Sequence, residues 1–214
     1  EAGKKHLAMQ VGQWAVELHG TLRVGLSARV DRMLDKVQYE IFYGGRVRSW
    51  MNGKTKVFLP AANEDVVYVF AHILQHFYKG GIGLRQICDW CRLLLTHKDA
   101  LNVPLLEARL RKAGIMTEWK AFASLSVDRL GMPKDDMPFY DERYRRKGEM
   151  VLRLVMEAGN FGHNKDLSYR TRYKGVMYKM VSLWRRIGDF VRFIPIFPLD
   201  APRFFVGYLV KKVG

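Results

Sequence analysis

Apolar positions recur through the stretch from Glu64 to Leu95 and predict two helices joined by a glycine corner. The first helix is apolar on every face, which is typical of a helix at the centre of a domain. Its apolar residues are Val66, Val67, Phe70, Ile73, Leu74 and Phe77. The glycines between Gly80 and Gly83 then favour a turn before the second helix begins. We therefore expect this helix pair to form the centre of the fold.

Residues 1–60 combine strand and helix patterns. Apolar and polar positions alternate from Gln13 to His19 and predict a strand, with residues 5–10 as its expected hairpin partner. Helical spacing of apolar residues predicts a helix from Ser27, its expected N-cap, to about Tyr43. The pair Asn52-Gly53 then favours a second β-hairpin, because both residues suit its tight turn.

Residues 61–214 read as helical. Asn63 is the expected N-cap of the first long helix, because acidic residues follow it and are favourable in a first turn. Beyond the helix pair, helices are expected at about residues 104–113, 117–130, 142–158 and 168–190, before a short last helix. In the 168–190 helix the residues expected to face inward are Val176, Met177, Met180, Trp184 and Ile187. The pattern predicts an α+β protein that is predominantly helical, with a small mixed sheet in its first 60 residues and a division at about Pro60.

The charge of the chain is strongly positive, at +15 from 36 Lys and Arg against 21 Asp and Glu. The region from Asp141 to Gly214 supplies +9 of it, with 16 Lys and Arg against 7 Asp and Glu. Four tyrosines, Tyr144, Tyr169, Tyr173 and Tyr178, are interleaved with these cations. Aromatics among cations suit nucleic acid, and the same pattern also fits a solvated helix face. The charge indicates polyanionic partners without choosing among them.

Cys88 and Cys91 are the only cysteines, so the sequence has no disulfide framework. Reduced cysteines suit a cytoplasmic protein. No apolar run approaches the roughly 20 residues of a membrane span, so no transmembrane segment is expected.

The histidines His72 and His76 are spaced i and i+4, and this spacing presents both imidazoles on one helix face. An antiparallel return of the next helix would bring them near Cys88 and Cys91, a ligand set that suits structural zinc. The alternative is that both cysteines belong to the core, because they share their helix face with Leu84, Ile87, Leu94 and Leu95.

Lys79 and Arg85 flank the glycine corner, where backbone amides and a helix N-terminus can hold a phosphate. A plain helix-helix turn is the alternative reading. Arg85 and Asp89 also lie one helical turn apart, so they are candidates for an intrahelical ion pair.

Glu17 and His19 project from the same face of the first predicted hairpin. Nucleotidyl transfer commonly uses several carboxylates around Mg²⁺, and one glutamate cannot supply them. The sequence contains no Asp-x-Asp segment that would complete such a set. From the residues alone, a solvated strand position is the simpler interpretation of Glu17.

Taken together, five short segments resemble a family of bacterial proteins described as uncharacterised nucleotidyltransferases, within the polymerase-beta-like superfamily. The segments are Val16-Glu17-Leu18-His19, Phe58-Leu59-Pro60, His72 to Phe77, Gly83 to Trp90, and Gly159-Asn160-Phe161-Gly162. The resemblance implies transfer of a nucleoside monophosphate from a nucleoside triphosphate (NTP) to an acceptor that the sequence does not identify, with Mg²⁺ as cofactor.

The resemblance also implies roles for individual residues. Glu17 corresponds to the family's third catalytic acid and so to a metal ligand. The candidate substrate or nucleotide-binding residues are His19, His72, His76, Lys79, Arg85 and Asp89. Of these, His72, His76, Arg85 and Asp89 are expected to form one polar cluster at the junction with the Glu17 strand.

The missing Asp-x-Asp segment implies that residues 1–60 are part of a nucleotidyltransferase core and residues 61–214 a helical domain. On this interpretation the 214 residues belong to a longer parent and are inactive alone. The rival interpretation is a non-enzymatic basic helical module that binds RNA or another polyanion through the region from Asp141 to Lys212.

Overall fold

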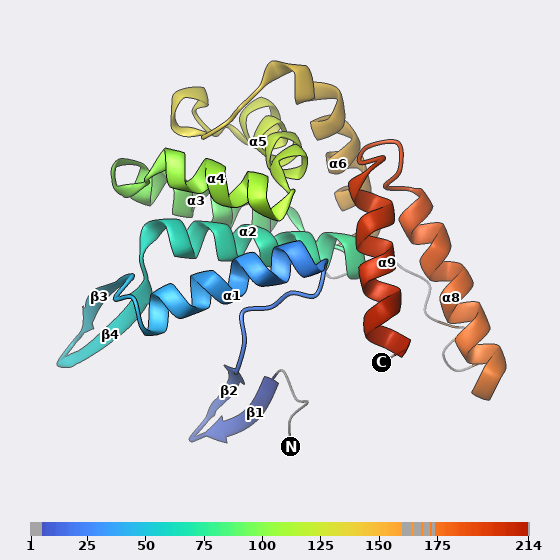
Figure 1. Cartoon of the computed structure of the whole chain (residues 1–214), viewed down its shortest axis with the longest axis horizontal. Coiled ribbons are helices and arrows are strands. Elements are labelled where there is room, and N and C mark those ends of the chain that lie inside the picture. The colour runs from blue at the N-terminus through green and yellow to red at the C-terminus, as the bar shows by residue number, and fades with distance from the viewer. Residues whose placement is uncertain (1–5, 160–163, 165–167, 169–171, 173, 214) are drawn as a thin grey trace.

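The computed structural model describes residues 6–159, 164, 168, 172 and 174–213. The chain folds into a helical body with two small hairpins, shown in Figure 1. Its strands are β1 (His6–Val11), β2 (Trp14–His19), β3 (Val47–Asn52) and β4 (Thr55–Pro60). Its α-helices are α1 (Ala28–Phe42), α2 (Ala62–Lys79), α3 (Leu84–His97), α4 (Val103–Ala113), α5 (Met116–Leu130), α6 (Arg145–Ala158), α8 (Gly175–Val191) and α9 (Asp200–Val213). The predicted class, α+β and mostly helical, is confirmed.

The strands form two separate antiparallel hairpins. β1 pairs with β2 from His6↔His19 to Val11↔Trp14, and β3 pairs with β4 around a turn in which Gly53 has φ 60°. That left-handed conformation is the one an Asn-Gly turn requires. The expected single mixed sheet is not formed among the described residues, because α1 separates the two hairpins along the chain and packs on helices.

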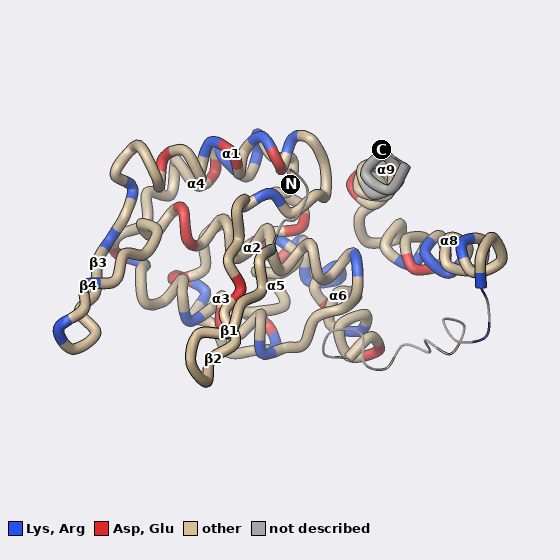
Figure 2. The backbone as a smooth tube through the Cα atoms, turned by 90° about the horizontal axis from the view of Figure 1, so that it is seen from below, with Lys and Arg blue, Asp and Glu red and all other residues tan. Residues whose placement is uncertain are grey.

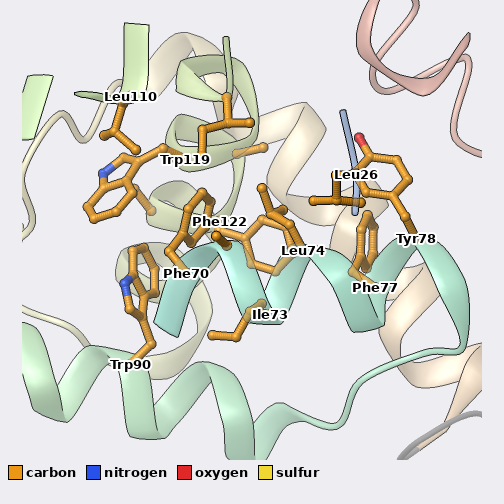
Figure 3. Close-up of a cluster of buried hydrophobic side chains, with 14 of the residues drawn as sticks. Leu26, Phe70, Ile73, Leu74, Phe77, Tyr78, Trp90, Leu110, Trp119 and Phe122 are labelled. Atoms are coloured by element: carbon orange, nitrogen blue, oxygen red, sulfur yellow. The ribbon is translucent and has the colours of Figure 1, made fainter. Parts of the chain in front are cut away.

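Helix α2 lies at the centre of the body and contacts α1, α3 and α4, with α1 and α4 on one side of it and α3 on the other (Figure 2). Phe70 of α2 packs against three aromatic rings, with ring-centroid distances of 5.1 Å to Trp90, 4.8 Å to Trp119 and 5.7 Å to Phe122. Figure 3 shows this aromatic cluster along α2. Because all four rings are fully buried, the predicted central role of the helix pair is confirmed.

Several helix ends follow ordinary capping chemistry. The Ser27 side chain accepts a hydrogen bond from the amide of Val30 at the start of α1, at 3.3 Å. Gly114 and Gly131 end α4 and α5 in the left-handed conformation, with φ of 68° and 77°. These caps agree with the sequence pattern.

Asn63 has a different role from the predicted one. Helix α2 begins at Ala62, so Asn63 lies inside its first turn and is buried. Its amide exchanges two hydrogen bonds of 2.8 Å with the backbone of Asn102. The predicted N-cap was wrong because a tertiary contact, which joins α2 to the start of α4, uses this side chain.

A buried ion-pair network joins α1, α2 and α4. Arg109 donates to Glu64 at 2.7 Å and also contacts Glu40, while Arg46 reaches Glu64 at 3.2 Å. Glu64 is completely buried, so its charge depends on these partners. Helix α1 precedes Pro60 and α2 follows it, and both contribute side chains to one hydrophobic core. The expected division of the chain at about Pro60 stays a prediction.

Helix α8 lies at the edge of the body. Of the five residues that were expected to face inward, Val176, Met177, Met180 and Trp184 are exposed, and Ile187 is half-buried. Phe190, near the end of the helix, is buried and packs against Tyr78 and Phe205. The predicted inward face was wrong because the body contacts α8 mainly through its C-terminal end.

Two sequence features lie wholly or largely outside the described residues: the glycine-containing loop from Gly159 to Asp166, and the tyrosines Tyr169 and Tyr173. Within the described part of the chain, none of the helices combines the length and apolar character that a membrane crossing requires.

Candidate functional site

The β1–β2 hairpin presents an apolar face to solvent. Its cross-strand pairs Leu7↔Leu18, Met9↔Val16 and Val11↔Trp14 lie on one side, and all six side chains are exposed. In Figure 1 the hairpin lies below α1, apart from the helical body. Since a two-stranded hairpin is only marginally stable by itself, this face is suited to packing against a further surface.

The opposite face of the hairpin carries Glu17 and His19. The Glu17 carboxylate lies 3.5 Å from the His19 imidazole nitrogen, with 68% of the Glu17 side chain and 33% of the His19 side chain exposed. The two residues share a face because they are two positions apart on β2. The prediction that both side chains project from the same face of the hairpin is therefore confirmed.

Glu17 does not form a magnesium site with the groups around it. Mg²⁺ requires about six oxygen ligands in octahedral geometry and is usually held by more than one carboxylate or by substrate phosphates. Throughout the described residues, no group of three or more His, Cys, Asp or Glu side chains is placed to hold a metal ion. One exposed carboxylate thus fits a single ligand position and not a complete site.

His72 and His76 are neighbours on α2, as their spacing predicts. Their Nε2 atoms are 3.1 Å apart, which places a ring N–H between the two imidazoles. The pKa of His76 is lowered, first by burial and then by the positive charge of Lys79. The neutral imidazole is therefore the form of His76 that this environment favours.

The alternative zinc site is not formed. Cys88 is exposed and Cys91 is buried, so the two thiols point in different directions from α3. Residues three positions apart on a helix are separated by only about 60° around its axis. Cys88 and Cys91 therefore lie on either side of the border between the buried and the exposed face of α3. The expectation that both cysteines are core residues was correct for Cys91 and wrong for Cys88.

Lys79 and Arg85, the two cations that flank the glycine corner, have different environments. The Lys79 ammonium donates a 2.7 Å hydrogen bond to the Val24 carbonyl, and the Lys79 carbonyl accepts one from Arg186. Arg85 is 90% exposed and lies 3.8 Å from Asp89, which is 62% exposed. Lys79 is thus part of the packing between α2 and the segment before α1, while Arg85 faces solvent.

The predicted junction of the helical polar residues with the Glu17 strand is not formed. Glu17 contacts His19 on the hairpin, while His72 contacts His76 on α2 and Arg85 contacts Asp89 on α3. The prediction failed because β2 does not pack on the α2–α3 pair, as Figure 1 shows. The assignment of the helical residues to nucleotide binding stays a prediction.

A cavity of about 500 Å³ lies between the start of α1 and α9, and the sequence did not predict it. Four arginines line it: Arg23, Arg29, Arg32 and Arg203. One signal was present in the sequence, because Arg29 and Arg32 lie in the first turns of a helix, where the helix dipole disfavours cations. The contribution of α9 was not readable, since it comes from a distant part of the chain.

The comparison with protein families matches residues 2–131 to a model described as an uncharacterised nucleotidyltransferase. The chain belongs to this family. No curated protein and no solved structure matches it. The matched segment includes the hairpin with Glu17 and ends at Gly131, so α6, α8 and α9 lie beyond it.

Proposed function

We propose that the chain is part of a nucleotidyltransferase that transfers a nucleoside monophosphate from an NTP to an acceptor. The observation that carries this proposal is the family match over residues 2–131, which includes Glu17. In the proposal, residues 1–60 belong to the catalytic core and residues 61–214 form a helical domain. A cytoplasmic location is part of the proposal, since Cys88 and Cys91 are free thiols.

The role proposed for Glu17 is that of an acidic ligand beside the reacting phosphates. Its exposure and its position on a projecting hairpin leave room for a substrate, and His19 lies beside it as a hydrogen-bonding group. The apolar face on the reverse side gives the hairpin a surface for packing against the rest of a catalytic sheet.

We further propose that the complete reaction uses Mg²⁺. The described residues do not make a site for this ion alone, so the 214 residues are expected to be inactive by themselves. Activity requires a parent polypeptide that adds carboxylates next to Glu17.

The test is a transfer assay of the proposed parent polypeptide. The substrate is NTP labelled at the α-phosphate, and a cell extract supplies the acceptor. Nucleotidyl transfer moves the α-label into a covalent product and releases pyrophosphate. Release of orthophosphate without labelled product would indicate hydrolysis of the terminal phosphate and would contradict the proposal. The 214-residue chain is the matched control, and it is expected to give no labelled product.

A second candidate function is binding of RNA or another polyanion by the basic C-terminal region. Figure 2 shows several Lys and Arg positions along α8, and Lys179 and Arg185 are exposed there. Several other cations of this region are already paired, such as Arg145 with Asp128 and Arg192 with Glu157. This function predicts binding that weakens steeply with salt, and an absence of binding at low salt would exclude it.

A further inference from the structure

The arginine-lined cavity lies where three elements meet. Its walls are the segment from Arg23 to Ser27, the first turns of α1, and one face of α9. Figures 1 and 2 both place the beginning of α1 beside α9. A second cavity, of about 490 Å³, shares Arg29 and Arg203 with the first and adds Arg111 from α4. Each cavity falls within the range of about 300–1,000 Å³ that is usual for small-molecule sites.

The cations in the first cavity stand in an electrostatically unfavourable place. The N-terminus of α1 carries a partial positive charge from its free amides, and Arg29 and Arg32 add two full charges within its first turns. Asp31 offsets part of this charge, but its carboxylate already accepts a hydrogen bond from the Gly25 amide at 2.8 Å. An anion in the cavity would relieve the repulsion.

Arg29 and Arg203 converge on the end of α4. Both guanidinium groups approach Gly114, and a Cβ there would lie 2.4 Å from one nitrogen of Arg203 and 3.1 Å from one of Arg29. Arg203 donates to the Gly114 carbonyl and pairs with Asp200 at 3.0 Å, while Arg29 donates to two other carbonyls of the same helix end. These bonds orient the two groups and hold them side by side.

Capping of α4 accounts for Arg29 and Arg203 but not for the other two arginines. Arg23 is held by Asp35 through two hydrogen bonds of 2.5 and 2.7 Å. Arg32 is exposed and has no ion pair or hydrogen bond with any residue that the structure describes. It lies one helical turn from Arg29, so both side chains reach the same cavity.

Apart from the four arginines and the carboxylates of Asp31 and Asp35, the walls of the cavity are small or apolar. Ala28 begins α1, and Val206 and Gly207 come from α9. Gly207 is required there, because a Cβ would lie 2.4 Å from the Leu26 carbonyl oxygen. The site therefore combines a cationic side with a surface on which a planar or apolar group can rest.

We propose that this cavity binds a nucleotide, with the phosphate chain on Arg29, Arg32 and Arg203 and the base against Ala28 and Val206. The inference rests on the proposed function. It places the NTP of that function in a cavity whose lining residues are not among the predicted nucleotide-binding residues. Arg23 follows Glu17 by six residues, which span at most about 20 Å of extended chain. The hairpin is thus tethered within about 20 Å of the cavity.

Isothermal titration calorimetry on the chain tests this site without any transfer reaction. The probes are ATP, inorganic tripolyphosphate and adenosine, at low ionic strength and without Mg²⁺. ATP is expected to bind more tightly than tripolyphosphate, and adenosine is expected to show no measurable binding. Two variants address the two halves of the site: Arg32→Gln removes a cation that has no described partner in the fold, and Val206→Trp fills the cavity.

Arg32→Gln is expected to weaken ATP binding about tenfold, since a hydrogen bond to a charged group is lost. Val206→Trp is expected to weaken it at least as much, and Arg129→Gln, which removes an exposed arginine outside the cavity, by less than about twofold. Equal effects of Arg32→Gln and Arg129→Gln would overturn the site, and so would unchanged binding in Val206→Trp. If tripolyphosphate bound as tightly as ATP, the proposed contact of the base with Ala28 and Val206 would be wrong.

The two proposals fail in different ways. If ATP binds and the cavity variants do not change its affinity, the site is wrong while nucleotidyl transfer remains open. If the cavity variants weaken ATP binding and the parent polypeptide forms no α-labelled product, the proposed function is wrong and the nucleotide site stands.

Discussion

The helical body and the β1–β2 hairpin use their apolar residues in opposite ways. In the body, Phe70, Trp90 and Trp119 are fully buried and pack ring against ring. In the hairpin, Trp14 is 69% exposed although it belongs to an equally regular apolar pattern. The same residue type therefore stabilises the fold in one region and is available to a further surface in the other. Stability and the proposed chemistry are located in different parts of the molecule.

Two tryptophans test this contrast most strongly. Trp119→Ala removes a ring that packs on Phe70 and Trp90 and donates a 2.7 Å hydrogen bond to the Pro138 carbonyl. We expect it to lower the free energy of unfolding by about 3–5 kcal/mol. Trp14→Ala removes an indole from the hairpin and is expected to change the free energy of unfolding by no more than about 0.5 kcal/mol. Urea unfolding measures both, and similar losses in the two variants would contradict the contrast.

Two arginines make the same comparison for charged residues. Arg109→Met leaves the fully buried Glu64 without its closest partner, and we expect a loss of about 3–5 kcal/mol in the free energy of unfolding. Arg85→Met breaks an exposed pair with Asp89, for which a change within about 0.5 kcal/mol is expected. A small effect of Arg109→Met would show that the buried network is not needed to hold α4 on α1 and α2.

Glu118 gives the helical body a stability that depends on pH. Burial raises the pKa of Glu118 to about 8, with a further contribution from the negative charge of Asp200. Tyr78 donates to one carboxyl oxygen of Glu118, and the other is buried with no hydrogen-bond partner in the part of the chain that the structure describes. A proton on that second oxygen allows it to donate to Asp200, whose own pKa is also raised by burial.

The sign of the effect follows from this raised pKa. Between about pH 4.5 and 8 the folded state holds a proton that the unfolded state has lost, so stability is greatest below about pH 4.5 and falls as pH rises towards 8. Glu118→Gln keeps a neutral group of the same shape and should remove this slope. At pH 9 we expect the variant to be more stable than the wild type, by an amount on the order of 3 kcal/mol. Parallel pH profiles of the two proteins would contradict the assignment to Glu118.

Local patterns predicted the elements well. The Asn52-Gly53 turn, the Ser27 cap and the terminal glycines of α4 and α5 all depend on neighbouring residues, and the structure has them where expected. The all-round apolar character of α2 also identified the centre of the body.

Contacts between distant segments were not predictable. Asn63 has the residue type of an N-cap and is instead used to bond Asn102, 39 positions away. The alternating pattern of β2 predicted an apolar face but not whether anything in the chain covers it. The arginine-lined cavity depends on α9 lying beside α1, and no periodicity in either segment encodes that placement.

The central claim is that Glu17 acts in the chemistry and not in the fold. The most direct measurement compares the rate of α-label transfer from NTP by Glu17→Gln and by the wild type, both in the proposed parent polypeptide. Glu142→Gln is the matched control, because its side chain is 61% exposed and lies in η3 (Glu142–Tyr144), outside the hairpin. We predict a loss of about a hundredfold or more for Glu17→Gln, as expected when a group worth several kcal/mol beside the reacting phosphates is removed, with no change for the control. Equal rates in the wild type and Glu17→Gln would contradict the account.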